Sequence, residues 1–177
     1  NIQSYSEKAL IQNIAFVFQR SQLLKTSIYE NVRIGNPQAT RQQIMDALDA
    51  ANCTSILDKF PQREMTVIGA KGVYLSGGEV QRIAIARAIL KNANIVIMDE
   101  ASAAADPENE YELQQAFQKL MRGKTVIMIA HRLASIQNVD QNGKVVEQGT
   151  HNELMACNGR YKDFQDVYCK ANQWRLA

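Results

Sequence analysis

The sequence predicts an α/β protein built on a mainly parallel β-sheet. Three short apolar segments, residues 13–18, 94–98 and 124–130, have the composition of buried strands. Segments in which apolar residues recur at helical spacing lie between them along the chain. This alternation is typical of a parallel sheet covered by helices on both faces. With 177 residues, the chain has the length of one domain with a sizeable core.

Capping signals and apolar spacing predict where the helices begin and which faces they bury. Thr40 and Gln43 are spaced as a capping box, in which each side chain bonds the other residue's backbone amide. Residues 44–51 then place their apolar side chains on one face of a helix. Two longer helices are expected at 78–90 and 108–121, because both segments repeat apolar residues at helical spacing.

The C-terminal part of the chain has weaker signals. Residues 144–148 predict a short strand that is more polar than the other three. Thr150 and Glu153 are spaced as a second capping box, which predicts another helix start.

Composition and charge exclude several classes of function. The chain has 20 basic and 18 acidic residues, a net charge of +2 and no dense basic run, which argues against nucleic-acid binding. Cys53, Cys157 and Cys169 lack the spacing of a metal site, so we expect free thiols in a reducing compartment. The longest apolar runs are too short to cross a bilayer. Because the chain begins with Asn1 and not with Met, we expect a fragment.

Ser76, Gly77 and Gly78 form a bare, hydroxyl-bearing turn at the expected start of a long helix. A helix N-terminus presents unpaired amides and the positive end of the helix dipole, and glycines let an anion approach the backbone closely. Phosphate is the candidate anion. The alternative is an ordinary serine N-cap after a turn, and these three residues fit both interpretations.

Two acidic residues stand where a strand is expected to end. Asp99 and Glu100 follow the strand at 94–98, and the carboxyl ends of parallel strands form the edge at which α/β proteins bind ligands. An aspartate at this edge suits Mg²⁺, and an adjacent glutamate suits the deprotonation of an attacking water. The alternative for both is the acidic first turn of a following helix.

His131 and Gln19 stand after two other expected strands. A histidine at such an edge can hydrogen-bond a phosphate, although a lone histidine is more often structural. A glutamine can contact Mg²⁺ or the attacking water, but it is uninformative by itself. Together with the two acids, His131 gathers three ionisable groups at one sheet edge, which favours a site.

In order and spacing, these segments resemble the motifs of ATP-binding cassette (ABC) proteins. Residues 75–79, LSGGE, are similar to the signature motif, and residues 95–100, IVIMDE, to the Walker B strand with its catalytic glutamate. SAAAD at 102–106, AHR at 130–132 and VFQ at 17–19 are similar to the D-loop, the histidine switch and the Q-loop.

The resemblance extends to the exporter-type branch, whose cassettes follow a membrane domain in one polypeptide. Residues 25–37 and 146–154 carry this likeness. The family's fold is a P-loop NTPase-like ABC ATPase core with a mainly parallel sheet plus a helical subdomain. The resemblance therefore assigns residues 1–177 to a single, incomplete nucleotide-binding domain, with the helical, signature-bearing subdomain inserted at about 20–92.

ATP and Mg²⁺ are the bound groups that the resemblance implies. Asp99 and Gln19 would serve Mg²⁺ and its waters. Glu100 would be the general base, and His131 would steady the γ-phosphate. Such a site achieves phosphoryl transfer through positioning and charge neutralisation.

A second cassette, closed head to tail on the first, is the partner that the resemblance implies. Ser76, Gly77 and Gly78 would hold the γ-phosphate of an ATP molecule bound mainly to that second cassette. Asp106 would communicate across the dimer.

The chain departs from the family pattern in several places. The Walker A pattern G-x-x-x-x-G-K-[ST] does not occur, so we expect this chain alone to bind ATP poorly. One family strand is missing at Gln141 and Asn142. Ala70 stands where exporters usually carry an acidic residue, and Glu79 and Ala105 replace the commoner Gln and Leu.

We therefore expect the ATP-hydrolysing motor domain of an exporter-type ABC transporter, driving transport by ATP-dependent dimerisation. It would work at the cytoplasmic face of the membrane, joined to a transmembrane domain, although this piece itself is expected to be soluble. One alternative is a soluble ABC ATPase that acts on DNA or ribosomes, against which the near-neutral charge argues. The other is a non-catalytic cassette that lends its signature turn to a partner, against which Glu100 argues.

Overall fold

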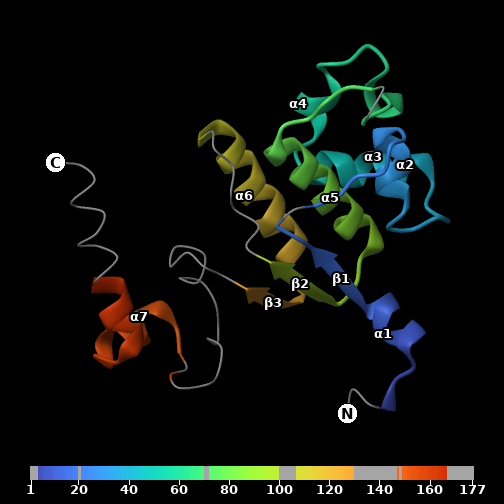
Figure 1. The fold of residues 1–177 in the computed structure, drawn as a ribbon. Coiled ribbons are helices and arrows are strands. Elements are labelled where there is room, and N and C mark those ends of the chain that lie inside the picture. The colour runs from blue at the N-terminus through green and yellow to red at the C-terminus, as the bar shows by residue number, and fades with distance from the viewer. Residues whose placement is uncertain are drawn as a thin grey trace. The chain divides into compact units, whose positions relative to one another are not determined.

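The computed structural model describes residues 4–19, 21–69, 72–99, 107–129, 147 and 149–166 (Figure 1). The chain divides into two compact units, Asn1–Ile129 and Ala130–Ala177. In chain order, the elements of the first unit are α1 (Glu7–Asn13), β1 (Ile14–Val17), α2 (Ile28–Arg33), α3 (Arg41–Ala50), α4 (Thr54–Leu57), η2 (Arg63–Met65), α5 (Gly77–Lys91), β2 (Ile95–Asp99), α6 (Pro107–Met121) and β3 (Thr125–Ile129). None of the helices among the described residues is long and apolar enough to span a membrane.

The three strands form one parallel sheet in the order β1-β2-β3. Val17 pairs with Met98, which in turn pairs with Met128, so the three strands end at the same edge. This confirms the predicted parallel sheet. Each connection between neighbouring strands contains helices, as parallel pairing requires.

Helices α5 and α6 pack together along one face of the sheet (Figure 1). Both helices have the predicted positions. The core on this face joins alternate residues of the strands, such as Val17, Val96 and Met98, to the buried face of α6. The residues of that helix face are Leu113, Ala116, Phe117 and Leu120.

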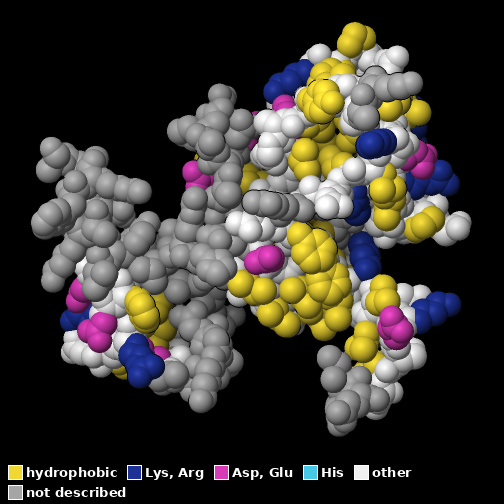
Figure 2. Space-filling view, in the orientation of Figure 1, with side chains coloured by type: hydrophobic (Ala, Val, Ile, Leu, Met, Phe, Trp, Pro, Cys, Tyr) yellow, Lys and Arg dark blue, Asp and Glu magenta, His cyan; other side chains and the backbone are white. Residues whose placement is uncertain are grey.

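The opposite face of the sheet is partly exposed within the first unit, and helical cover on this second face stays a prediction. Four apolar side chains on this face are between 46% and 58% exposed. They are Phe16 on β1, Phe18 just after β1, and Ile127 and Ile129 on β3. The rings of Phe16 and Phe18 stack with centroids 5.8 Å apart. Hydrophobic side chains gather over this part of the molecule (Figure 2). The strands have the composition of a doubly buried sheet, but the described residues of this unit supply helices to one face only.

Helices α2 to α5 fill the connection between β1 and β2. The predicted capping box at Thr40 and Gln43 is present and begins α3. The turn after α2 packs closely on α5, as shown by Gly35, where an added Cβ would overlap the carbonyl oxygen of Arg87. Asn92, in the left-handed conformation with φ of 50°, ends α5 as a C-cap.

Asn31, on α2, is fully buried and uses its whole side-chain amide in hydrogen bonds. Its Oδ1 accepts from the backbone N–H of Leu24 (2.7 Å) and from Nη2 of Arg87 (3.2 Å). Its Nδ2 donates to the carbonyl oxygens of Leu24 and Ser27, both at 3.0 Å. The loop that follows β1 is thereby fixed to α2 and α5.

The second unit contains α7 (His151–Ala156) and a further helical segment at 160–166. The predicted capping box at Thr150 and Glu153 is present at the start of α7. The carboxylate of Glu147 accepts the backbone N–H of Tyr161 at 2.9 Å, near the start of the second helical segment. The strand predicted at 144–148 lies largely outside the described residues.

Candidate functional site

Two of the predicted site residues lie at the same edge of the sheet. Asp99 ends β2, and Gln19 follows two residues after the end of β1. Both line one open pocket with a volume of about 550 Å³. The other lining residues are Phe16, Phe18, Ser21, Gln22, Ala84 and Arg87. The structure brings Gln19 and Asp99 together, and their role at Mg²⁺ stays a prediction.

The donors of this pocket fit an ion that keeps most of its water ligands. Asp99 offers one carboxylate and Gln19 one amide oxygen, and proteins commonly hold Mg²⁺ through one or two carboxylates with water and phosphate oxygens. Within the part of the chain that the structure describes, no group of three or more His, Cys, Asp or Glu side chains could hold a metal.

Arg87 is a pocket residue that the sequence analysis missed. Its Nε donates to the carbonyl oxygen of Asn31 (2.9 Å), and its Nη1 donates to that of Gln22 (3.4 Å). Burial lowers the pKa of Arg87, but a guanidinium remains charged in proteins. A fixed positive charge therefore lies beside the pocket. Its only signal in the sequence was a cationic residue within the helix expected at 78–90.

The Ser-Gly-Gly turn forms the N-terminus of α5, with Ser76 as the N-cap and Glu79 completing a capping box. The backbone N–H of Glu79 donates to Oγ of Ser76 (3.3 Å), and the backbone N–H of Ser76 donates to Oε2 of Glu79 (2.7 Å). Ser76 and Gly77 are exposed, whereas Gly78 is buried. A Cβ added at Gly77 would meet no atom of the described residues within 4 Å, so their packing does not require a glycine there. As far as these residues show, the turn is open to an external group.

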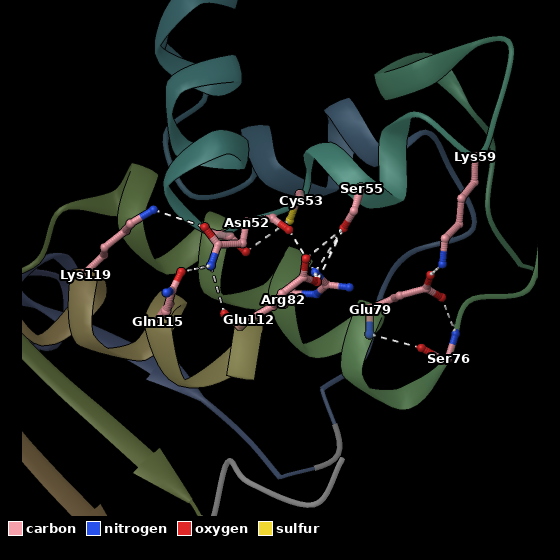
Figure 3. Close-up of polar contacts among 11 residues, drawn as sticks. Asn52, Cys53, Ser55, Lys59, Ser76, Glu79, Arg82, Glu112, Gln115 and Lys119 are labelled. Carbon is pink, nitrogen blue, oxygen red and sulfur yellow. Dashed lines mark hydrogen bonds and ion pairs between the residues drawn. The ribbon is translucent and has the colours of Figure 1, made fainter. Parts of the chain in front are cut away.

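Lys59 holds the other carboxylate oxygen of Glu79. Its Nζ lies 2.7 Å from Oε1 of Glu79 (Figure 3). Burial by itself would raise the pKa of Glu79, but the hydrogen bonds from Lys59 and Ser76 outweigh it and hold that pKa below its ordinary value. The carboxyl is therefore charged at neutral pH. Sequence reasoning missed this pair, because Lys59 stands in a segment without periodicity.

A buried arginine, Arg82, fixes α5 to neighbouring parts of the fold. Nη1 of Arg82 donates to the carbonyl oxygen of Asn52 (2.9 Å) and to Oγ of Ser55 (3.2 Å), and it forms an ion pair with Glu112 (Figure 3). Nζ of Lys119 donates to Oδ1 of Asn52 at 3.1 Å. These contacts join α5 to the start of α4 and to α6, so the helix that carries the turn is anchored at Arg82.

The described residues place the predicted site in two parts. Ser76 and its glycines do not contribute to the lining of the pocket at Gln19 and Asp99. Glu100, His131 and Asp106 lie outside the described residues, so their predicted roles stay predictions.

Comparison with known proteins bears on the identity of this site. A family model described as "ABC transporter" matches residues 1–103. The chain is 46% identical over 166 residues, 91% of its length, to ABC transporter B family member 4 of Dictyostelium discoideum. It is 42% identical over 168 residues, 92% of its length, to ABC transporter B family member 14 of Arabidopsis thaliana.

A bacterial relative shows similar identity. The chain is 42% identical over 166 residues, 91% of its length, to the ATP-dependent lipid A-core flippase of Chromohalobacter salexigens. The aligned segment spans 22%, 14% and 29% of the lengths of these three relatives, respectively.

Proposed function

Since the chain belongs to the ABC transporter family, we propose that it is part of the ATP-hydrolysing motor domain of an exporter-type transporter. The relatives named as B family members and as an ATP-dependent flippase support this proposal. In the whole protein, the motor works against a transmembrane domain at the cytoplasmic face of the membrane. It drives transport by ATP-dependent closure onto a second cassette.

ATP and Mg²⁺ are the groups that the strand-end pocket serves. ATP supplies the phosphoryl group, and Mg²⁺ neutralises charge that develops on it. Asp99 and Gln19 hold the ion or its waters, and their convergence on one pocket is the observation that carries the proposal. Glu100, next to Asp99 in the chain, accepts the proton of the attacking water. His131 contacts the γ-phosphate.

The Ser-Gly-Gly turn serves a different ATP molecule, bound mainly by the second cassette. Ser76 and Gly77 are exposed, open to an external group and absent from the lining of their own chain's pocket, which supports this assignment. The backbone amides and hydroxyl of the turn can donate to phosphate oxygens at the positive end of α5. Asp106 then couples the two sites across the dimer.

The role of Glu100 is tested with Glu100→Gln in the full-length protein. The glutamine keeps the size of the side chain but cannot take a proton, so we expect ATP to bind and hydrolysis to fall by at least about 100-fold. ATP should then hold the two cassettes closed, as measured by crosslinking or sizing. The control is Asp163→Asn, which removes an exposed carboxylate from the second unit. Unchanged turnover in Glu100→Gln would refute the base assignment.

The role of the turn is tested with Ser76→Arg, which places a long side chain where an incoming phosphate would lie. ATP should still bind to the strand-end pocket, but ATP-dependent closure should be lost. Gln38→Arg adds the same side chain at an exposed loop position and serves as the matched control. Normal closure in Ser76→Arg would show that the turn does not face a second cassette.

A further inference from the structure

We propose that Lys59 is a positioning residue that neutralises Glu79 beneath the Ser-Gly-Gly turn, so that the turn can accept a phosphate. This inference deepens the proposed function and rests on it. The juxtaposition that carries it is a single carboxylate bonded at one oxygen to the backbone N–H of Ser76 and at the other to Nζ of Lys59.

The carboxylate of Glu79 occupies the positive end of α5 that a phosphate would use. Its side chain is only 7% exposed, so water screens its charge weakly. An acidic side chain in the first turn is favoured by the helix dipole, and for the same reason it competes with any second anion brought to that turn. A phosphate arriving at Ser76 would therefore meet a fixed negative charge. A glutamine at the same position would bring no such charge.

Lys59 removes this conflict without entering the turn. It lies between α4 and η2, and its side chain remains 58% exposed, although its amine is 2.7 Å from the carboxylate. Among the described residues, the ion pair to Glu79 comes from Lys59, while the neighbouring Arg63 pairs with Asp58. The helix start therefore keeps its capping box and also carries a balanced charge.

A purely structural clamp is the alternative role for the same contact, and two substitutions distinguish them. Lys59→Met keeps the apolar stem of the side chain and leaves the Glu79 charge uncompensated. Glu79→Gln removes that charge and keeps a residue that can complete a capping box. Charge neutralisation predicts that Lys59→Met impairs phosphate acceptance and that Glu79→Gln does not, whereas a clamp predicts that both substitutions impair it.

The measurement is the ATP concentration that half-closes the cassettes of the full-length protein, at about 50 mM and about 500 mM salt. Lys59→Met should raise this concentration about tenfold at low salt, the effect of one uncompensated charge near a surface. The difference should shrink at high salt because screening weakens the repulsion. Glu79→Gln should not raise the concentration, and the double variant should return to within about twofold of the parent.

Lys8→Met, which removes an exposed lysine on α1, is the matched control, and thermal unfolding of each variant shows that it folds. Equal losses in Lys59→Met and Glu79→Gln, or no rescue in the double variant, would overturn the inference in favour of a clamp. An unchanged half-closing concentration in Lys59→Met would overturn it as well. A parent protein that does not close with ATP at all would instead refute the proposed function.

Discussion

Replacement of Arg82 by methionine tests the reasoning about what holds α5 in place. The arginine side chain is 1% exposed, and it donates to Asn52 and Ser55 as well as pairing with Glu112. Methionine fills most of the same space, so the cost comes chiefly from lost polar contacts and a carboxylate without its cation. Breaking a buried ion pair on one side costs about 3–5 kcal/mol.

The position of Glu112 decides where in that range the value falls. Its side chain is 32% exposed, so water can solvate the carboxylate in part after the arginine is removed. We therefore expect Arg82→Met to lower the free energy of unfolding by about 3 kcal/mol. At about 2–4 °C per kcal/mol for a chain of this size, the midpoint of thermal unfolding should fall by about 6–12 °C.

Urea unfolding followed by far-UV circular dichroism gives the free energy, with Arg33→Met as the matched control. Arg33 pairs with Glu30 on the surface, where both side chains are 45% exposed, so its loss should cost less than about 1 kcal/mol. The reasoning is refuted if Arg82→Met lowers the free energy of unfolding no more than Arg33→Met does, with the same dependence of that free energy on urea concentration. The buried network around Arg82 would then not hold α5 in place.

Three further predictions follow from burial and close contacts. Burial raises the pKa of Cys53 to about 12, so iodoacetamide at about pH 8 should label the exposed Cys157 first, as mass spectrometry of the native protein would show. Equal labelling would contradict the burial. Gly35→Ala should lower the free energy of unfolding in urea by about 1–3 kcal/mol, because the new Cβ would overlap a carbonyl oxygen of α5. Gly77→Ala should not lower it in this way, because the space around Gly77 is open among the described residues. The hydrogen bond from Arg41 holds the pKa of Glu64 below its ordinary value of 4.5. The charged Glu64 therefore adds to the free energy of unfolding above pH 4.5, and this contribution is lost as the pH falls through the lower pKa of the folded state. Glu64→Gln should make the free energy of unfolding fall less steeply with decreasing pH in the acid range. An unchanged dependence on pH in that range would contradict this.

Periodicity and local signals predicted the regular elements because those signals lie within a few residues of each other. The capping box at Thr40 depends on a residue three positions later, and the apolar spacing of residues 108–121 depends on one helix. The ends of the parallel strands followed from the α/β pattern, and they placed Gln19 and Asp99 at one edge. The cover of the second face of the sheet stays a prediction, because the apolar pattern indicates burial but not which segment provides the cover.

The contacts that support the turn could not be predicted from the sequence. Lys59 and Glu79 are 20 residues apart, and Arg82 and Glu112 are 30 apart. In each pair the two residues lie in different parts of the fold, and the sequence pattern does not specify how those parts pack together. In the sequence, a lysine that pairs with a buried carboxylate cannot be told from a lysine that is simply exposed. Only the folded chain therefore distinguishes Lys59 from Lys8.

The buried amide of Asn31 has a consequence for motion. The loop after β1, helix α2 and helix α5 share its four hydrogen bonds, and the side chain that makes them is fully buried. Local opening of the loop would leave donors and acceptors unsatisfied, at about 1–3 kcal/mol for each group. The segment that links the sheet edge to the helices should therefore open cooperatively with α2, and its amide hydrogens should exchange with solvent together and late.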